Sequence, residues 1–141
     1  MTIDQISIFL ENKFGRLNEI LAFLAKEDIR VIAASVADTS DYGILRLITN
    51  NQIKALQVLK ANGVSANLNT VLAISVNSAI GEMSKTLEYF TKAGINIEYM
   101  YCFSFNQKAV LILRTNNIDA ANEVIRRYNL NNLSESDLNN F

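Results

Sequence analysis

The groups best placed to bind a ligand lie in the stretch 12–17, which reads NKFGRL. It follows the apolar run 6–10 and leads through Gly15 into an amphipathic helix. Amides at a helix start have no partner inside the helix, and the helix dipole adds partial positive charge, so an anionic group is favoured there. Here the amides belong to residues 16–18, and Asn12 adds a side chain that both donates and accepts. This mixture suits the carboxylate and ammonium of a free amino acid; alternatively, Gly15 only permits a tight turn.

The remaining reactive side chains argue against an enzyme. The chain has no histidine, and Cys102 is its one cysteine. This removes the commonest general base, the histidine-assisted nucleophiles and the commonest metal ligand. One cysteine cannot form a zinc or iron–sulfur site by itself. We therefore expect no catalytic residues, no metal and no cofactor.

Composition describes a small globular protein without an obvious charged partner. The chain has 141 residues, half of them apolar and 19% charged, with a net charge of −1. This charge predicts neither nucleic-acid nor membrane binding. No apolar stretch approaches the roughly 20 residues that span a bilayer. The acidic N-terminal stretch and the single cysteine indicate a cytoplasmic location.

The sequence contains an internal repeat with an offset of 66 residues. The tripeptide Thr-Asn-Asn recurs at 49–51 and 115–117. The other matching pairs include Ile8/Ile74, Gly15/Gly81, Leu21/Leu87, Lys26/Lys92, Ile29/Ile95, Leu45/Leu111, Leu47/Leu113, Ala55/Ala121 and Val58/Val124. Because these identities fall at element junctions and apolar positions without a gap, the pattern indicates two copies of one unit, residues 1–69 and 70–141.

Hydrophobic periodicity assigns the same elements to both copies. In the first copy it predicts a strand at 6–10, a helix from about 16 to 26, strands at 31–38 and 44–49 joined by a turn at 39–43, a helix that starts at Asn50 or Asn51 and ends at Gly63, and a weak strand at 64–69. In the second copy it predicts strands at 71–76, 95–105 and 109–115, helices at 81–92 and 118–128, and a poor last strand. There, Ser134 and Asp137 suit a cap for a short helical turn.

This order predicts an α+β fold made of two ferredoxin-like βαββαβ units, each an antiparallel sheet with helices on one face. Right-handed crossovers give the strand order 4-1-3-2, so the second strand of each unit lies at an edge. Exposed edges favour pairing, and we expect two units to join at their second strands.

The second copy also carries an aromatic strand face. One face of the expected strand carries the aromatic residues Tyr99, Tyr101, Phe103 and Phe105, whereas Met100 lies on the other face. Because the helices cover one face only, the aromatic face is a candidate oligomer interface, the alternative being ordinary core.

The segment 11–36 resembles the opening of an ACT domain: a strand, then Asn-x-Pro-Gly-x-Leu, a helix, and an apolar strand. Asn12 and Gly15 match the motif, whereas Phe14 stands at its proline, which leaves the loop less rigid. In the second copy the glycine is Gly81, but the asparagine position holds Ser78. The tandem resemblance covers nearly the whole chain. It implies the same βαββαβ fold and amino-acid binding between two units of a homo-oligomer, with a dimer expected.

The resemblance also implies two unequal ligand sites. The family places a second asparagine at the start of strand two; Asn96 matches it, whereas Arg30 stands there in the first copy. The expected ligand site comprises Asn12, Lys13, Phe14, Gly15, Arg16, Leu17, Asn96 and Ile97. A second possible ligand site comprises Ser78, Ala79, Ile80, Gly81, Glu82, Met83, Arg30 and Val31, where Arg30 alternatively pairs with Glu82 or remains solvated.

The expected function is therefore an amino-acid-binding regulatory or sensor protein that acts through a partner enzyme or regulator. An alternative is a structural or partner-binding regulatory subunit with no small-molecule ligand. An RNA-recognition module shares the fold order, but its central strands need stacking aromatics that 44–49 and 109–115 lack.

Overall fold

The computed structural model describes residues 1–38 and 41–141. The chain forms two compact units, Asp4–Asn69 (the N-terminal unit) and Thr70–Phe141 together with Met1–Ile3 (the C-terminal unit). The first three residues thus group with the C-terminal unit, whereas the sequence placed them in the first copy. Two hydrogen bonds explain this: the Met1 ammonium donates to Asn122 Oδ1 (3.0 Å), and Asn132 Nδ2 donates to the Met1 carbonyl (2.9 Å).

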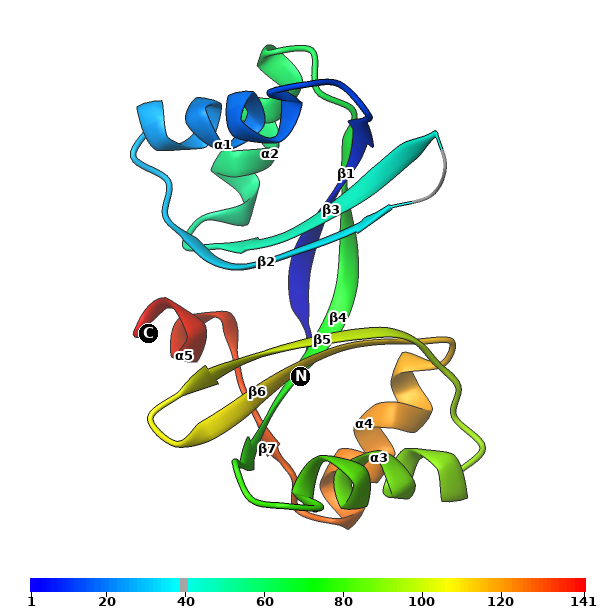
Figure 1. Ribbon diagram of the computed structural model, residues 1–141. Helices are drawn as coiled ribbons and strands as arrows, with labels where there is room; N and C mark the ends of the chain where they lie inside the picture. The colour runs from blue at the N-terminus through cyan, green and yellow to red at the C-terminus, as the bar shows by residue number, and fades with distance from the viewer. Residues whose placement is uncertain (39–40) are drawn as a thin grey trace. The chain divides into compact units, whose positions relative to one another are not determined.

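The N-terminal unit has the predicted βαββαβ order (Figure 1). Its elements are β1 (Ile3–Glu11), α1 (Arg16–Lys26), β2 (Val31–Asp38), β3 (Tyr42–Thr49), α2 (Gln52–Ala61) and the beginning of β4 (Ala66–Asn77). The strands follow the order β2-β3-β1-β4, which is the predicted 4-1-3-2 arrangement. The expected turn at 39–43 begins with Thr39 and Ser40, which lie outside the described residues.

The C-terminal unit repeats the order with the rest of β4 as its first strand. The further elements are α3 (Glu82–Lys92), β5 (Ile97–Phe105), β6 (Lys108–Thr115), α4 (Ile118–Arg127), β7 (Asn131–Asn132) and α5 (Glu135–Asn139). β4 pairs antiparallel with both β6 and β7, and β5 pairs with β6, so the order is β7-β4-β6-β5. The α+β fold of two such units is confirmed. The weak strand expected at 64–69 is instead the first part of the long strand β4, and the poor last strand has two residues.

Each unit has its own core between the sheet and two helices. In the N-terminal unit, Ile8 and Leu45 face each other across β1 and β3 and pack with Leu24 of α1 and Leu59 of α2, all four fully buried. In the C-terminal unit, Ile74 and Leu111 are the equivalent pair and pack with Phe90 of α3 and Ala121 of α4. Alternate strand residues therefore face the helices, as the period of two predicts.

The repeated asparagines start the second helix of each unit. Asn51 Oδ1 accepts a hydrogen bond from the Lys54 amide, and Asn117 Oδ1 accepts one from the Ala120 amide, both at 3.0 Å. These side chains satisfy one of the free amides at each helix start. Of the two caps predicted, Asn51 rather than Asn50 performs this role.

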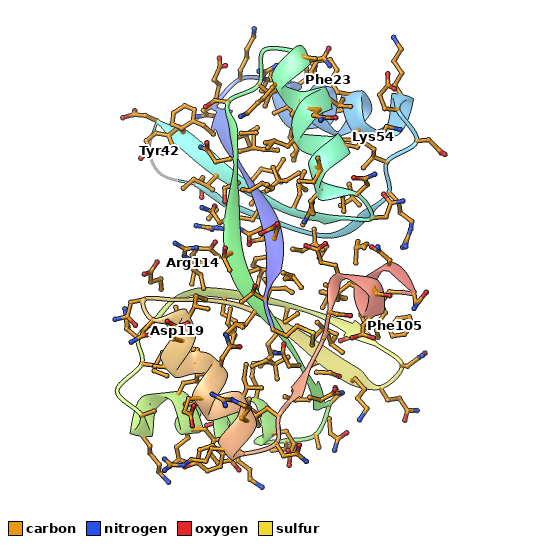
Figure 2. The ribbon with its side chains drawn as sticks, turned by 180° about the vertical axis from the view of Figure 1, so that it is seen from behind. Phe23, Tyr42, Lys54, Phe105, Arg114 and Asp119 are labelled. Atoms are coloured by element: carbon orange, nitrogen blue, oxygen red, sulfur yellow. The ribbon has the colours of Figure 1, made fainter. Side chains whose placement is uncertain are left out.

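A short C-terminal helix lies against the aromatic side of β5. Met100 packs with the core beneath α3 and α4, which leaves Phe103 and Phe105 on the opposite side of the strand. Phe141 stacks on Phe105 with ring centroids 4.3 Å apart and meets Phe103 edge-on at 5.9 Å. Figure 2 shows Phe105 beside α5. Phe103 and Phe105 therefore lie on the side away from Met100, as expected, and Phe141 of the same chain contacts them. The oligomer interface on this face stays a prediction.

A capping box starts this helix. Ser134 Oγ accepts from the Asp137 amide (3.1 Å), while the Ser134 amide donates to Asp137 Oδ2 (2.8 Å). The bond from the Ser134 backbone, followed by that from its hydroxyl, lowers the pKa of Asp137 below its ordinary value of 3.8. Because the folded-state pKa is the lower one, the stabilisation is complete above the ordinary pKa and is lost as the pH falls through the folded-state pKa.

We therefore expect Ser134→Ala to raise the pKa of Asp137 towards its ordinary value. Carbon-detected NMR titration of the side-chain carboxyl measures this directly. Ser136→Ala, on the same helix, is the control and leaves the titration unchanged. An unaltered Asp137 pKa in Ser134→Ala would contradict the capping box.

Candidate functional site

The loops that join the first strand to the first helix have the same backbone geometry in both units. Gly15 has φ 79° and ψ −1°, and Gly81 has φ 84° and ψ −9°. A Cβ at either position would meet nothing within 4 Å. Glycine is therefore needed for the left-handed backbone and not for a close approach of another element.

Neither of these helices has a side-chain cap, because its N-cap residue is the glycine. The first helical amide is nevertheless used inside the loop: the Arg16 amide donates to the Lys13 carbonyl (3.1 Å) and the Glu82 amide to the Ala79 carbonyl (3.2 Å). Of the three amides expected to be available at 16–18, those of Leu17 and Asn18 remain candidates for a ligand. The Arg16 amide does not.

The tip of each loop is apolar and fully exposed. Phe14 and Ile80 occupy equivalent positions of the repeat, and their exposed fractions are 105% and 106%. Asn12 and Ser78, two residues earlier, are exposed as well. Large apolar side chains that are fully exposed can pack against a ligand or another protein surface.

Charges at the two helix starts are opposite in sign. Arg16 donates to Glu19 (2.6 Å) and lies 3.9 Å from Glu11, and its side chain is only 15% exposed. Glu82 stands at the equivalent position of α3. A carboxylate therefore stands at the first position of α3, whereas the first position of α1 carries a cation that Glu11 and Glu19 already pair with. The pairing suggested between Glu82 and Arg30 joins residues of different units and stays a prediction.

A repeated side-chain contact holds the start of the second strand. The Arg30 amide donates to Asn50 Oδ1 (2.9 Å), and the Asn50 amide donates to the Arg30 carbonyl (3.0 Å). Asn96 and Asn116 make the same reciprocal pair, with both distances 3.3 Å. This role was not predicted from the sequence, although the repeated Thr-Asn-Asn marks it in both units. The contact leaves the Asn96 side chain exposed at the beginning of β5.

Two adjoining hollows follow one side of α3 in the C-terminal unit. One is lined by Gly81, Met83, Ser84, Leu87, Glu88 and Thr91. The other is lined by Leu87, Thr91, Gly94, Ile95, Asn96 and Ile97. Leu87 and Thr91 are common to both, so together they form one groove, here called the outer groove of α3. Gly81 and Met83 of one predicted site line one end of this groove, and Asn96 and Ile97 of the other line the opposite end.

In the N-terminal unit the predicted residues lie at the two ends of α1. Residues 12–17 form the loop and first turn, whereas Arg30 and Val31 follow the helix at the start of β2. Val31 is half-buried and pairs with Thr49 of β3. Each unit thus supplies one loop and one second-strand start.

The described residues 1–38 and 41–141 include no group of three or more metal-ligating side chains placed to hold an ion. Within the same residues, no helix is long and apolar enough to cross a membrane. Cys102 is exposed on β5.

The pattern of a known family, described as an ACT domain pair, matches residues 1–141. The chain belongs to this family. Among curated proteins, no sequence matches.

Solved structures agree with this assignment. Protein BT0572 from Bacteroides thetaiotaomicron is 40% identical over 100% of this chain and 98% of its own, with a TM-score of 0.95. The regulatory subunit of aspartate kinase from Thermus thermophilus is 16% identical over 90% of this chain and 96% of its own, with a TM-score of 0.64. The regulatory subunit of aspartate kinase from Thermus flavus is 18% identical over 90% of this chain and 94% of its own, with a TM-score of 0.60. The two aspartate kinase subunits share the fold with this chain.

We expect Gly81→Ala to lower the free energy of unfolding by about 1 kcal/mol, because alanine resists the left-handed backbone. Gly81→Asn costs less, since asparagine tolerates this conformation. Urea denaturation of both variants, with Ser84→Ala as the helix-surface control, measures the difference. Equal stability of the alanine variant and the wild type would contradict the conformational requirement.

Proposed function

We propose that this ACT domain pair is a non-enzymatic sensor of a free amino acid, which binds where the loop of one unit meets the second-strand start of another. The observation that carries the proposal is the outer groove of α3. It has an uncapped helix start at one end and the exposed Asn96 at the other. One end of the groove thus offers donors for a carboxylate, and the other end offers an amide side chain for an ammonium, the two kinds of group that an amino acid needs.

The length of the helix requires two units for one site. α3 has 11 residues, which corresponds to a length of roughly 16 Å. An amino acid of about ten heavy atoms cannot contact both ends of such a helix. A complete site therefore needs the loop of one unit and the strand start of another.

The outer strands offer the means of bringing units together. Among described residues, β2 pairs with β3 alone and β5 pairs with β6 alone. If two such edges pair antiparallel, the adjacent helices run in opposite directions. Each loop then lies beside the second-strand start of the other unit. Such pairing of two copies would make the protein a homo-oligomer, with a dimer as its smallest form.

The chemistry of the two loops favours the one at 12–17. It carries the asparagine that the ACT motif uses, and no carboxylate stands at its first helical position. Glu82 does stand there in the other loop. We propose that Asn12, Gly15 and Leu17 of one unit act with Asn96 and Ile97 of another, while Lys13, Phe14 and Arg16 complete the loop. The set 78–83 with Arg30 and Val31 is the weaker site.

A regulatory subunit that binds a protein and no small molecule is the second candidate. The full exposure of Phe14 and Ile80 favours it, because both lie at equivalent loop tips. In either case the output passes through a partner enzyme or regulator.

We expect one amino acid of the twenty to raise the melting temperature, because a ligand that binds the folded state stabilises it. Its affinity lies in the micromolar to millimolar range under ordinary ligand-efficiency limits. In calorimetric titration, Asn12→Ala and Asn96→Ala each weaken binding about tenfold, since each removes a hydrogen bond to a charged group.

Two controls make this titration specific. Asn67→Ala, on an exposed position of β4, leaves the affinity unchanged. Ser78→Ala tests the other loop. Loss of affinity in Ser78→Ala, with full affinity in Asn12→Ala, would move the site to 78–83. The absence of any stabilising amino acid would favour the partner-binding subunit.

We also expect Thr91→Lys to separate the oligomer, because it places a charge at the centre of the outer groove. Light scattering coupled to size exclusion measures the mass. Ala61→Lys, at an exposed position of α2, is the matched control and leaves it unchanged. A wild-type protein that is monomeric with or without ligand would contradict pairing between copies.

A further inference from the structure

A second hollow lies on the other side of α3, within the C-terminal unit. It is lined by the end of β4, one side of α3, the first residue of β6 and the connection from α4 to β7. Lys85, Tyr89, Lys108 and Tyr128 are the side chains that give it chemical character. We call it the inner cleft. It shares no residue with the outer groove of α3.

Helical geometry separates the two. Glu82, Lys85 and Tyr89 follow one another at intervals of three and four residues, so they share one side of α3. Leu87 and Thr91 of the outer groove lie about half a turn away from them. A ligand in the inner cleft therefore does not compete with one in the outer groove.

Two ammonium groups line the inner cleft without an acidic partner. Lys108 Nζ donates to Asn77 Oδ1 at 2.9 Å, which is a neutral acceptor. Lys85 forms no ion pair within 4.0 Å among the residues that the structure describes. Glu82 is the single carboxylate in the lining. The side chains of the cleft thus carry one net positive charge.

The repeat places different charges at the same positions of the other unit. Asn77, Glu82 and Lys85 correspond to Glu11, Arg16 and Glu19 at the offset of 66. There the largely buried Arg16 pairs with both carboxylates, so its positive charge is taken up within the protein and the three side chains sum to one negative charge. In the C-terminal unit the equivalent residues leave cations that an external anion can neutralise.

An aromatic surface completes the inner cleft. The rings of Tyr89 and Tyr128 stack with centroids 4.0 Å apart and planes 12° from parallel. Tyr128 is 39% exposed. An ordered aromatic pair with an accessible ring offers a flat contact to a planar ligand.

We propose that the inner cleft binds a small planar organic acid, with its carboxylate on Lys85 and Lys108 and its ring against Tyr128. One net positive charge matches a monocarboxylate. A phosphate dianion is disfavoured because Glu82 lines the same cleft. The cleft belongs to the C-terminal unit alone, so this binding is independent of the amino-acid site.

Titration with benzoate, followed by amide NMR, tests the proposal. Benzoate shifts amides of the inner cleft, and Lys85→Gln and Lys108→Gln each weaken it about tenfold, because each removes a charge-assisted contact. Tyr128→Ala weakens it as well. Lys60→Gln, an exposed lysine at the end of α2, is the control and changes nothing.

Three outcomes would overturn the proposal. Neutral benzamide could bind as tightly as benzoate, the shifts could map to the outer groove of α3, or the two lysine variants could retain full affinity. Asn12→Ala and Asn96→Ala are expected to bind benzoate normally, so failure of the amino-acid sensor leaves this result unchanged. The spectra also report whether each variant is folded.

Discussion

A left-handed glycine between the first strand and the first helix controls what each unit presents to its surroundings. With this backbone the chain turns from β1 into α1, and from β4 into α3, and each helix begins without a side-chain cap. The same turn leaves Phe14 or Ile80 fully exposed at the loop tip.

The two units share this backbone, but the charged side chains near the start of the first helix differ between them. Arg16 is paired with two glutamates, whereas Glu82 lines a cleft together with two lysines. A duplicated unit needs to keep the apolar pattern that forms its core, because core substitutions cost several kcal/mol. Surface charges near a helix start are far less costly to change. This difference explains how identical folds offer chemically distinct surfaces on the two halves.

The second strand is held at its start by its neighbours and is open along its outer edge. Asn50 and Asn116 each accept from the backbone of the residue before the strand and donate back to it. These contacts fasten Arg30 and Asn96 near the end of the first helix. Among the described residues, β2 and β5 are each paired along one edge only, which is the edge that the proposed pairing of units would use.

The sequence by itself determined the repeat, the α+β class, the βαββαβ order and the strand order 4-1-3-2. These follow from local signals, namely periodicity, glycine and asparagine positions, and the handedness of crossovers. It also predicted the cap formed by Ser134 and Asp137, because both partners lie within one helical turn. It could not determine that β4 is continuous, that Phe141 covers Phe105, or that Arg16 is enclosed while Lys85 is not. The continuity of β4 and the contact between Phe141 and Phe105 depend on parts of the chain that are distant in the sequence. The pairing of Arg16, and its absence at Lys85 among the described residues, depends on side-chain rotamers that only the folded chain sets. The pairing of the ligand-site residues depends on a further level, the contact between units, and therefore remains a proposal.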